Sequence, residues 1–436
     1  MKMFMDQKQE AVDIFVSGVE SVKPGNLIRH YVSMDNDSLW MNGILFDLPA
    51  IKNIYVIGFG KASAAMAQAL ESILESKITE GCIITKYGHS VPLKYTEIIE
   101  AGHPIPDENG IQGTKRILSI VNNAGKDDLV ICLISGGGSA LLADVPEGCT
   151  LDDLKLLNDI LLKAGANITE MNCIRKHLSK VKGGLLSKAV YPARLVSLII
   201  SDVIGDPLDV IASGTTAPDP TTFAEAVSIL EKYKIADVIP DKMYRFLLDG
   251  LKNKHPETLK ESDEILLRTS NLIVGTNVLA LKTAKEKAES FGYKTQIITN
   301  SLGGDVTDVA AYIVEKVKSA DKNSCLLFAG EPTVKVTGTG LGGRNQHLAL
   351  IIADLLKGMS GTTILVAGTD GSDGPTDVAG AVVDTSTWMN ASKLDLNMEQ
   401  YIRNNDAYHF FELEGGLIIT GPTQTNVMDL MIALIQ

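Results

Sequence analysis

Glycine-rich turns carry charged side chains at several points of this chain where an apolar strand is followed by a helix. The first such turn, Gly58-Phe59-Gly60-Lys61, follows the apolar run 54–57. The free backbone N–H groups and the dipole of a helix N-terminus both favour a bound anion. We therefore expect Lys61 to bind a negatively charged group, with Gly58 and Gly60 allowing the backbone to approach it.

A second turn follows another apolar run and reads Ser135-Gly136-Gly137-Gly138-Ser139. Three consecutive glycines are more than a tight turn requires, and successive N–H groups can form a nest for a phosphate or a carboxylate. Ser139 adds a hydrogen-bond donor. The surrounding residues do not match the GxSxG pattern of serine hydrolases, so this turn is predicted to bind an anion rather than to carry a nucleophile.

A third turn, Gly342-Gly343-Arg344-Asn345, opens a segment with apolar residues at helical spacing. The helix dipole disfavours a cation at this end, so a bound anion is the expected compensation for Arg344. The guanidinium fork suits phosphate oxygens, and an arginine aimed at a migrating phosphoryl group recurs in kinases. This turn therefore predicts a further phosphate site.

Carboxylates follow two other apolar runs. Asp202 and Asp206 come after one of them, and Asp370 and Asp373 come after the other. Magnesium needs one or two protein carboxylates together with phosphate oxygens. We expect these side chains to hold Mg²⁺ or another divalent cation, the alternative being helix capping and turn formation. The same two loops also carry Asp209 and Asp377.

The remaining polar residues indicate no second chemistry. His103 lies in a rigid turn, and His347 is expected to be exposed. Arg175, Lys176 and His177 begin a basic helical stretch, which we interpret as a solvated face, with substrate contact as the alternative. No group of histidines and cysteines has the spacing of a zinc site.

The elements that must position these turns follow one recurring pattern: a short β-branched run, a glycine-containing turn and a helical stretch. Fully apolar strands that alternate with helices indicate parallel sheets covered on both faces. Turn-rich segments such as 215–222 place a domain boundary near residue 240, which gives domains 1–240 and 241–436. The strand-like segment 332–336 predicts that the second sheet is mixed.

The composition limits the partners of the chain. Its 436 residues include 40 Lys and Arg against 53 Asp and Glu, which gives a formal charge of −13. This balance argues against a nucleic-acid binder, yet a few local cations can still focus an anionic substrate into a pocket. The five cysteines form no CxxC pair, which favours buried thiols in a reducing compartment.

The sequence also argues against a membrane protein. No run reaches the roughly 18 apolar residues that a membrane-spanning helix needs. Residues 1–20 carry charges throughout, with Val12, Phe15, Val16 and Val19 at helical spacing, so no secretory segment is expected there. We expect a soluble, cytoplasmic protein.

Taken together, the motifs resemble the type II glycerate 2-kinases of bacteria and archaea, the MOFRL-type proteins, many of which carry an older hydroxypyruvate reductase name. The resemblance spans nearly the whole chain and rests on six ordered segments: Gly58–Ser63, Ala101–Gly110, Leu133–Leu142, Ser201–Phe223, Gly330–Gln346 and Gly368–Asp384.

The resemblance implies ATP-dependent phosphorylation of D-glycerate at the 2-hydroxyl, with a divalent cation. It also implies an N-terminal Rossmann-like domain with a doubly wound sheet, a smaller C-terminal α/β domain and an active site in the cleft between them. The lysine and arginine of the family correspond to Lys61 and Arg344, and the aspartate of its GTDG motif corresponds to Asp370. Glycerate and ATP are then the small-molecule partners, and assembly into a homo-oligomer is left open.

The hypothesis that follows assigns a role to each turn. Lys61 and Arg344 stabilise charge on the moving phosphoryl group. Asp202 or Asp370 holds Mg²⁺ or positions the glycerate hydroxyl. The nest at 136–139 holds an anion, either the glycerate carboxylate or a nucleotide phosphate.

Two rival functions stay open. An NAD(P)H-dependent hydroxypyruvate reductase is disfavoured because Ser63 replaces the third glycine of a dinucleotide fingerprint and Lys86 stands where an acid would bind the ribose. A non-enzymatic sensor of sugar acids or nucleotides explains the glycine-rich turns, but not the lysine, the arginine and the aspartates together.

Overall fold

The computed structural model describes residues 7–436, which fall into two units. We name residues 27–274 the parallel-sheet unit, and residues 7–26 with 275–436 the mixed-sheet unit. The boundary therefore lies at residue 274 and not near residue 240, where the sequence placed it. The reason is that the polar segment after residue 240 packs helix α10 onto the helices before it, and strand β9 then joins the first sheet.

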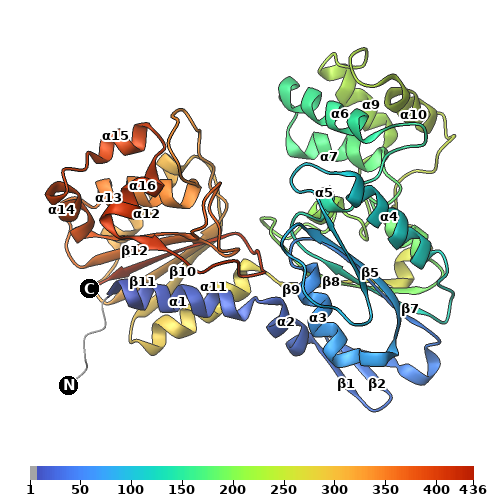
Figure 1. The fold of residues 1–436 in the computed structure, drawn as a ribbon, viewed down its shortest axis with the longest axis horizontal. Coiled ribbons are helices and arrows are strands. Elements are labelled where there is room, and N and C mark those ends of the chain that lie inside the picture. Colours follow the sequence, from blue (N-terminus) through green and yellow to red (C-terminus); the bar gives the residue numbers. More distant parts are fainter. Residues whose placement is uncertain (1–6) are drawn as a thin grey trace. The chain divides into compact units, whose positions relative to one another are not determined.

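The parallel-sheet unit is built on six strands in the order β6-β5-β4-β7-β8-β9 (Figure 1). Their bounds are β4 (Ile54–Phe59), β5 (Ile78–Lys86), β6 (Glu97–Ala101), β7 (Leu129–Ile134), β8 (Arg194–Ile200) and β9 (Thr269–Gly275). The pairs β5–β6, β4–β5, β4–β7 and β7–β8 are parallel. Every residue of β4 and β7 is buried, as expected of central strands with both faces covered, so the predicted parallel sheet is confirmed.

The order of the strands reverses between β4 and β7. The chain runs outward from β4 through β5 to β6, returns to the middle of the sheet, and runs outward again from β7 through β8 to β9. This is the strand order of doubly wound sheets, whose ligands bind at the carboxyl ends of the strands that flank the reversal. The turns after β4 and β7 are those that carry Lys61 and Ser135–Ser139, so both predicted anion sites stand at this position.

Two groups of helices complete this unit. The sheet is packed by α3 (Ser63–Leu74), α4 (Glu108–Val121) and α8 (Leu185–Val190). A separate apolar core joins the helices that Figure 1 shows together at one end of the unit: α6 (Leu151–Ala164), α7 (Ile168–His177), α9 (Phe223–Lys232) and α10 (Asp241–Leu251).

Shorter elements fill the rest of the unit. An antiparallel meander is formed by β1 (Val32–Asp35), β2 (Ser38–Met41) and β3 (Ile44–Asp47). The short helices are η1 (Leu48–Ala50), η2 (Glu75–Lys77), α5 (Gly138–Leu141), η3 (Ile211–Ser213) and η4 (Glu264–Arg268). Helix α2 (Pro24–Tyr31) leads into the unit.

The mixed-sheet unit has a second sheet of six strands in the order β10-β11-β15-β12-β13-β14. The strands are β10 (Lys294–Leu302), β11 (Ser324–Gly330), β12 (Thr362–Gly368), β13 (Gly380–Asp384), β14 (Leu417–Ile418) and β15 (Asp429–Ile435). Only β10 and β11 pair in parallel, and the other pairs are antiparallel, which confirms the predicted mixed sheet. The segment 332–336 is not one of its strands, because it contributes a single bridge between Thr333 and Asp305.

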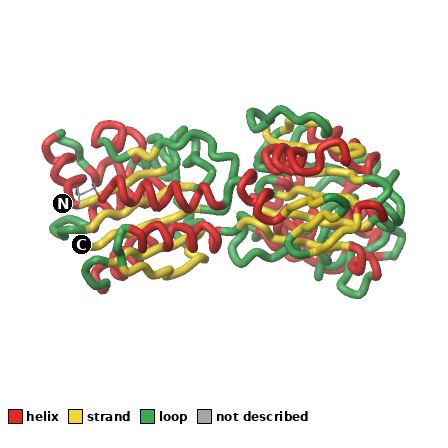
Figure 2. The backbone as a smooth tube through the Cα atoms, turned by 90° about the horizontal axis from the view of Figure 1, so that it is seen from below, coloured by secondary structure: helices red, strands yellow, loops and turns green. Residues whose placement is uncertain are grey.

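Helices cover both faces of this second sheet. Helices α1 (Gln7–Ser21) and α11 (Asn277–Ser290) pack against each other on one face, where Figure 2 shows two long helices lying along the strands. The predicted N-terminal helix is thus confirmed as α1. The other face is covered by α12 (Val306–Ser319), α13 (Arg344–Leu355), α14 (Thr385–Lys393), α15 (Met398–Arg403) and α16 (Ala407–Glu414).

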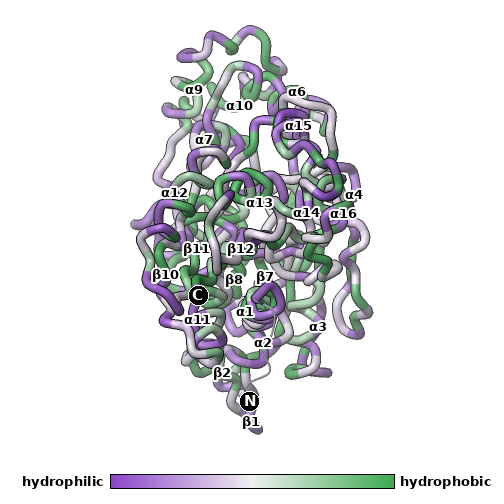
Figure 3. The backbone as a smooth tube through the Cα atoms, turned by 90° about the vertical axis from the view of Figure 1, so that its left-hand side faces the viewer, coloured by the Kyte–Doolittle hydropathy of each residue, from purple (hydrophilic) through white to green (hydrophobic). Residues whose placement is uncertain are grey.

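The cores of both units are aliphatic. In Figure 3 hydrophobic stretches of the chain run through the region of β8, β11 and β12. All five cysteines are free thiols; Cys82, Cys132, Cys173 and Cys325 are buried, and Cys149 is half-buried. Within residues 7–436 there is no helix of the length and apolar character that a membrane crossing requires.

A buried glutamate ties the segment before β6 to helix α3. The Glu71 carboxylate accepts hydrogen bonds of 2.7–2.9 Å from the backbone N–H groups of Lys94, Tyr95 and Thr96 and from the Thr96 hydroxyl. We expect Glu71→Ala to lower the free energy of unfolding by about 3 kcal/mol, since it leaves four donors, two of them buried, without an acceptor. Denaturant unfolding measures the change, with the exposed Glu75→Ala as control. An equal effect of the two substitutions would contradict this role.

Candidate active site

The turn after β4 and the turn after β7 are in direct contact. The Lys61 N–H donates a hydrogen bond to the Gly136 carbonyl oxygen at 2.9 Å, and the Ala62 N–H donates to the Ser135 hydroxyl at 3.0 Å. Gly60 permits this approach because its φ is +130° and a Cβ there would lie 2.2 Å from the Ser135 hydroxyl oxygen. The first two predicted anion sites are therefore neighbouring parts of one site.

Asp202, which follows β8, belongs to the same site. A Cβ on Gly136 would lie 2.1 Å from the Asp202 Oδ2, so the carboxylate rests against the glycine backbone. A Cβ on Gly137 would lie 2.8 Å from the His103 ring and 3.4 Å from the Lys61 Cγ. We name Lys61, His103, Gly136, Gly137 and Asp202 the strand-end cluster.

His103 is the neutral member of the strand-end cluster near pH 7. Burial and the nearby ammonium groups of Lys61 and Lys86 lower its pKa to about 4. His103 therefore adds no positive charge to the strand-end cluster beside that of Lys61.

A second polar group surrounds the end of the glycine-rich turn after β7, and we name its members the Ser139 group: Ser139, Arg175, Lys182 and Ser213. The Arg175 Nη2 donates to the Ser139 hydroxyl at 2.8 Å, and the Ser139 and Ser213 hydroxyl oxygens lie 2.7 Å apart. The Lys182 ammonium donates to the carbonyl oxygens of Ser139 and Leu142 at 3.0 and 2.8 Å. Burial lowers the pKa of Lys182 to about 8.

The basic residues at 175–177 correct an interpretation made from the sequence. They end helix α7 rather than begin a helix, and Lys176 and His177 are buried rather than solvated. The Lys176 ammonium lies 3.2 Å from the Asp219 carboxylate and 3.6 Å from that of Asp209. Because these carboxylates come from a loop far along the sequence, helical position alone did not indicate that the lysine is buried.

Arg344 in the mixed-sheet unit is held by carboxylates. Its Nε and Nη2 donate to the two oxygens of Asp429 at 2.6 and 3.1 Å, and its Nη1 donates to Glu331 at 2.7 Å. Burial alone would lower the arginine pKa, but these partners raise it. The sequence predicted a bound anion as the compensation at this helix N-terminus; in the structure Asp429 and Glu331 supply it.

Asp373 caps the same helix, α13. Its Oδ1 accepts from the Asn345 N–H at 3.0 Å, and its Oδ2 accepts from the Gln346 N–H at 2.8 Å and from the Gln346 side-chain amide at 2.9 Å. Gly343 allows this approach, because a Cβ there would lie 2.3 Å from the Asp373 Oδ1. Both oxygens of Asp373, one of the four predicted metal-binding aspartates, therefore already accept hydrogen bonds from a helix end.

The glycine-rich loop before Gly342 is held by the protein itself. The Asn405 Oδ1 accepts from the N–H groups of Thr337 and Gly338 at 2.8 and 2.9 Å. The Asp406 Oδ1 accepts from the Leu341 N–H at 2.9 Å. A Cβ on Gly338 would lie 2.2 Å from a backbone oxygen, so this glycine serves close packing rather than an open nest.

Two further predicted positions lie on this part of the unit. The Asp370 carboxylate accepts from the Ser372 N–H and hydroxyl, both at 3.1 Å, in the turn after β12. His347, expected to be exposed, is buried, because residues 345–353 of α13 are enclosed on all sides by the sheet and the other helices. Asp377 is exposed.

The predicted metal-binding aspartates do not form a cluster that could surround a magnesium ion with protein ligands. Among residues 7–436 there is no group of three or more His, Cys, Asp or Glu side chains placed to hold a metal ion. Magnesium commonly uses one or two carboxylates and takes its other ligands from phosphates and water. Asp202, half-buried in the strand-end cluster, and Asp206, half-buried in the same loop, fit that arrangement.

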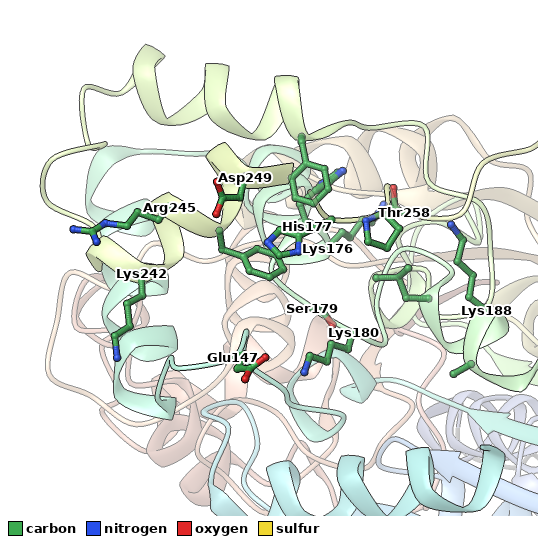
Figure 4. A pocket seen from close by; sticks show the side chains of 16 residues that line it. Glu147, Lys176, His177, Ser179, Lys180, Lys188, Lys242, Arg245, Asp249 and Thr258 are labelled. Atoms are coloured by element: carbon green, nitrogen blue, oxygen red, sulfur yellow. The ribbon is translucent and has the colours of Figure 1, made fainter. Parts of the chain in front are cut away.

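A cavity of about 750 Å³ opens between α7, α8, α10 and the segment 255–258. Figure 4 shows Lys242 and Arg245 on one side of it and Lys188 on the opposite side. The Lys188 ammonium lies 3.7 Å from Asp263, and the Lys242 ammonium donates to the Gly148 carbonyl at 2.7 Å. Lys188 is therefore paired with a carboxylate, whereas Lys242 contacts a neutral carbonyl oxygen.

Comparison with known proteins identifies the family. Residues 10–248 match the model described as a domain of unknown function, DUF4147, and residues 324–429 match the MOFRL family. A D-glycerate 2-kinase of Thermotoga maritima is 40% identical over 98% of this chain and 98% of its own length. The chain belongs to the MOFRL-type glycerate kinase family.

Further comparisons agree with this family. The solved structure of a glycerate kinase from Thermotoga maritima has a TM-score of 0.87 at 39% identity and covers 99% of each chain. A protein of Agrobacterium vitis that carries a hydroxypyruvate reductase name is 40% identical over 87% of this chain and 86% of its own length. The resemblance read from the six sequence segments is therefore confirmed.

Several site residues were missed from the sequence. Asp429 is the one charged side chain in the buried run Asp429–Ile435, and a lone acid beginning such a strand was the available signal. Lys182 precedes Gly183 and Gly184, a small glycine pair that resembles the other anion-binding turns. Ser213 and Glu331 gave no signal, because only the fold places them beside Ser139 and Arg344.

The Asp373 carboxyl should make the stability of this kinase-family protein depend on pH. Burial raises its pKa to about 6, whereas an unfolded aspartate titrates near about 4. The folded protein therefore binds this proton more tightly, and the stabilisation it gives at low pH is lost as the pH rises from about 4 to about 6. Asp373→Asn should remove that loss, whatever its effect on overall stability.

Denaturant unfolding of the wild type and the variant at several pH values between about 4 and 7 measures this dependence. The exposed Asp377→Asn is the matched control and should keep the wild-type slope. A slope that is unchanged in Asp373→Asn would contradict the assignment.

Proposed function

We propose that this chain transfers the γ-phosphoryl group of ATP to the 2-hydroxyl of D-glycerate. The observation that carries the proposal is the strand-end cluster, in which Lys61, Gly136 and Asp202 come from three different strand ends and meet where the strand order reverses. Its support is the full-length similarity to proteins named as glycerate kinases. Location in the cytoplasm and assembly into a homo-oligomer stay predictions.

The residues of the strand-end cluster divide the work of phosphoryl transfer. Lys61 stabilises the negative charge on the transferring group, because the transition state is loose and anionic. Asp202, fixed against Gly136, accepts a hydrogen bond from the glycerate hydroxyl and directs it at the phosphorus. Neutral His103 closes one side of the cluster without adding charge.

The mixed-sheet unit contributes Arg344 to the proposal. A guanidinium has five N–H donors, and Asp429 and Glu331 receive three hydrogen bonds from it. We assign the donors left over to oxygens of the phosphoryl group. Gly342, Gly343 and Asn345 then position Arg344 at the start of α13.

Magnesium is the expected partner of ATP in this reaction. Where Asp202 directs the hydroxyl, Asp206 or Asp370 would hold the ion; where Asp370 directs the hydroxyl, Asp202 would hold it. The hydrogen bonds to Asp373 make that residue a helix cap first. When bound, magnesium would neutralise negative charge on the phosphates of ATP.

The reductase alternative requires a dinucleotide site after β4. There, the Ser63 hydroxyl donates to the carbonyl oxygens of Gly60 and Ile84 at 2.7 and 3.2 Å, where the third glycine of the fingerprint would let helix and strand approach. Lys86 ends β5 at the position of the ribose-binding acid. These two side chains favour the kinase over the reductase.

The proposal is tested by incubating the protein with ATP, Mg²⁺ and D-glycerate and coupling the product to enolase, with and without phosphoglycerate mutase. The proposed reaction gives ADP and an enolase signal that needs no mutase. A signal that requires mutase would move the product to 3-phosphoglycerate. Absence of ADP, together with oxidation of NADH by hydroxypyruvate, would replace the kinase with the reductase.

The role of Lys61 predicts a selective loss of turnover. Lys61→Ala should lower kcat by a factor of about 100 to 1,000, as removal of a single charge-stabilising donor does elsewhere, while the melting temperature stays within a few degrees of the wild type. The exposed Lys77→Ala is the matched control. Turnover of Lys61→Ala within about threefold of the wild type would remove Lys61 from the reaction.

A further inference from the structure

Arg175 is a half-buried arginine that lacks a carboxylate partner among residues 7–436. Its Nη2 donates to the neutral Ser139 hydroxyl, and within residues 7–436 no ion pair joins it to an aspartate or glutamate. Two other arginines have carboxylate partners: Arg116 contacts Glu80 and Glu97, and Arg344 contacts Asp429 and Glu331.

An uncompensated guanidinium that is partly removed from water is unfavourable, as the lowering of the Arg175 pKa by burial also indicates. Proteins keep such a charge where a ligand supplies the counter-ion. Arg175 lies in the last turn of helix α7, next to Lys176. Lys176, in contrast, is paired with the carboxylates of Asp219 and Asp209. The difference between two adjacent cations of one helix sets Arg175 apart as a binding group.

The other members of the Ser139 group complete an anion-binding surface. The Ser139 and Ser213 hydroxyls lie side by side at 2.7 Å, and Ala212 and Ser213 keep left-handed backbone conformations with φ of +48° and +59°. Such conformations are costly for residues other than glycine, and they are retained where a side chain must be aimed. The Lys182 ammonium donates a hydrogen bond to the Ser139 carbonyl oxygen and so adds a second cation to this surface.

We infer that the Ser139 group binds the carboxylate of the acid that accepts the phosphoryl group, with Arg175 as its counter-ion. This inference rests on the proposed function. Of the two anionic substrates, it assigns the acceptor acid to the Ser139 group. The planar guanidinium fork matches a carboxylate in shape.

The charge of the group also favours a carboxylate over a nucleotide phosphate chain. The nearby Asp144 carboxylate offsets the Lys182 ammonium, so the Arg175 guanidinium is left to balance a single negative charge. A triphosphate carries several charges. Ser139 and Gly136 belong to one turn and are at most about 10 Å apart, so the acid bound here keeps its hydroxyl within reach of the strand-end cluster.

The test compares Arg175→Gln with the wild type. Calorimetric titration of D-glycerate in the absence of ATP, and the KM values for D-glycerate and ATP, are measured on both proteins. We expect Arg175→Gln to weaken glycerate binding about 10- to 100-fold, the loss of a hydrogen bond to a charged group, and to leave the KM for ATP within about twofold. Arg175→Lys should restore part of the affinity because it keeps the charge but loses the fork.

Two controls accompany the variant. Arg116→Gln removes the same charge from an arginine with two carboxylate partners and should leave both KM values unchanged. Glycerol, which lacks the carboxylate, should bind the wild type and Arg175→Gln equally poorly. If Arg175→Gln does not fold, Ser213→Ala replaces it, with an expected severalfold loss of glycerate affinity.

The outcomes separate this inference from the proposed function. Glycerate binding that is lost in Arg175→Gln supports the inference even where ATP turnover is absent and the kinase proposal fails. A raised KM for ATP with unchanged glycerate binding overturns it and assigns the group to a nucleotide phosphate. Unchanged values for both ligands also overturn it and leave Arg175 with a structural role.

Discussion

The reversal of strand order between β4 and β7 is the constraint on which the candidate site depends. Two neighbouring strands end there with turns that lead away in opposite directions across the sheet, so their backbones are exposed to a ligand at the same place. Gly60 and Gly136 make the approach possible, since a Cβ on either would lie within 2.2 Å of a side-chain oxygen. The close approach of these backbone turns therefore places Lys61 and Asp202 in the same site.

Charge compensation distinguishes Arg175, the proposed carboxylate-binding arginine, from two other cations of the same unit. Lys176 and Arg116 each contact two carboxylates, which offset the charge of the cation. Arg175 instead reaches a neutral hydroxyl. The sequence shows where a basic residue lies, but only its contacts in the fold show whether its charge is available to a ligand.

Much of the fold followed from the sequence, because buried parallel strands are continuous apolar runs and the glycine turns mark their ends. The strands around Lys61 and Ser135–Ser139 were predicted correctly for this reason. The domain boundary was not, because strand β9 adds to the first sheet after a long polar segment and nothing local indicates which sheet a strand joins.

The candidate site was predictable only in part. Charged residues next to glycine turns were found, but their partners Asp429, Glu331 and Ser213 lie far away in the sequence and are identified by contact alone. The same holds for Asp373, whose spacing suits a metal ligand and whose contacts are those of a helix cap.

The central claim, phosphorylation of the glycerate 2-hydroxyl, is tested most directly by ³¹P NMR of the mixture of protein, ATP, Mg²⁺ and D-glycerate. The account predicts ADP and a new phosphomonoester signal split into a doublet by the single proton on carbon 2. A triplet, from the two protons of carbon 3, or the absence of any new phosphomonoester would contradict it.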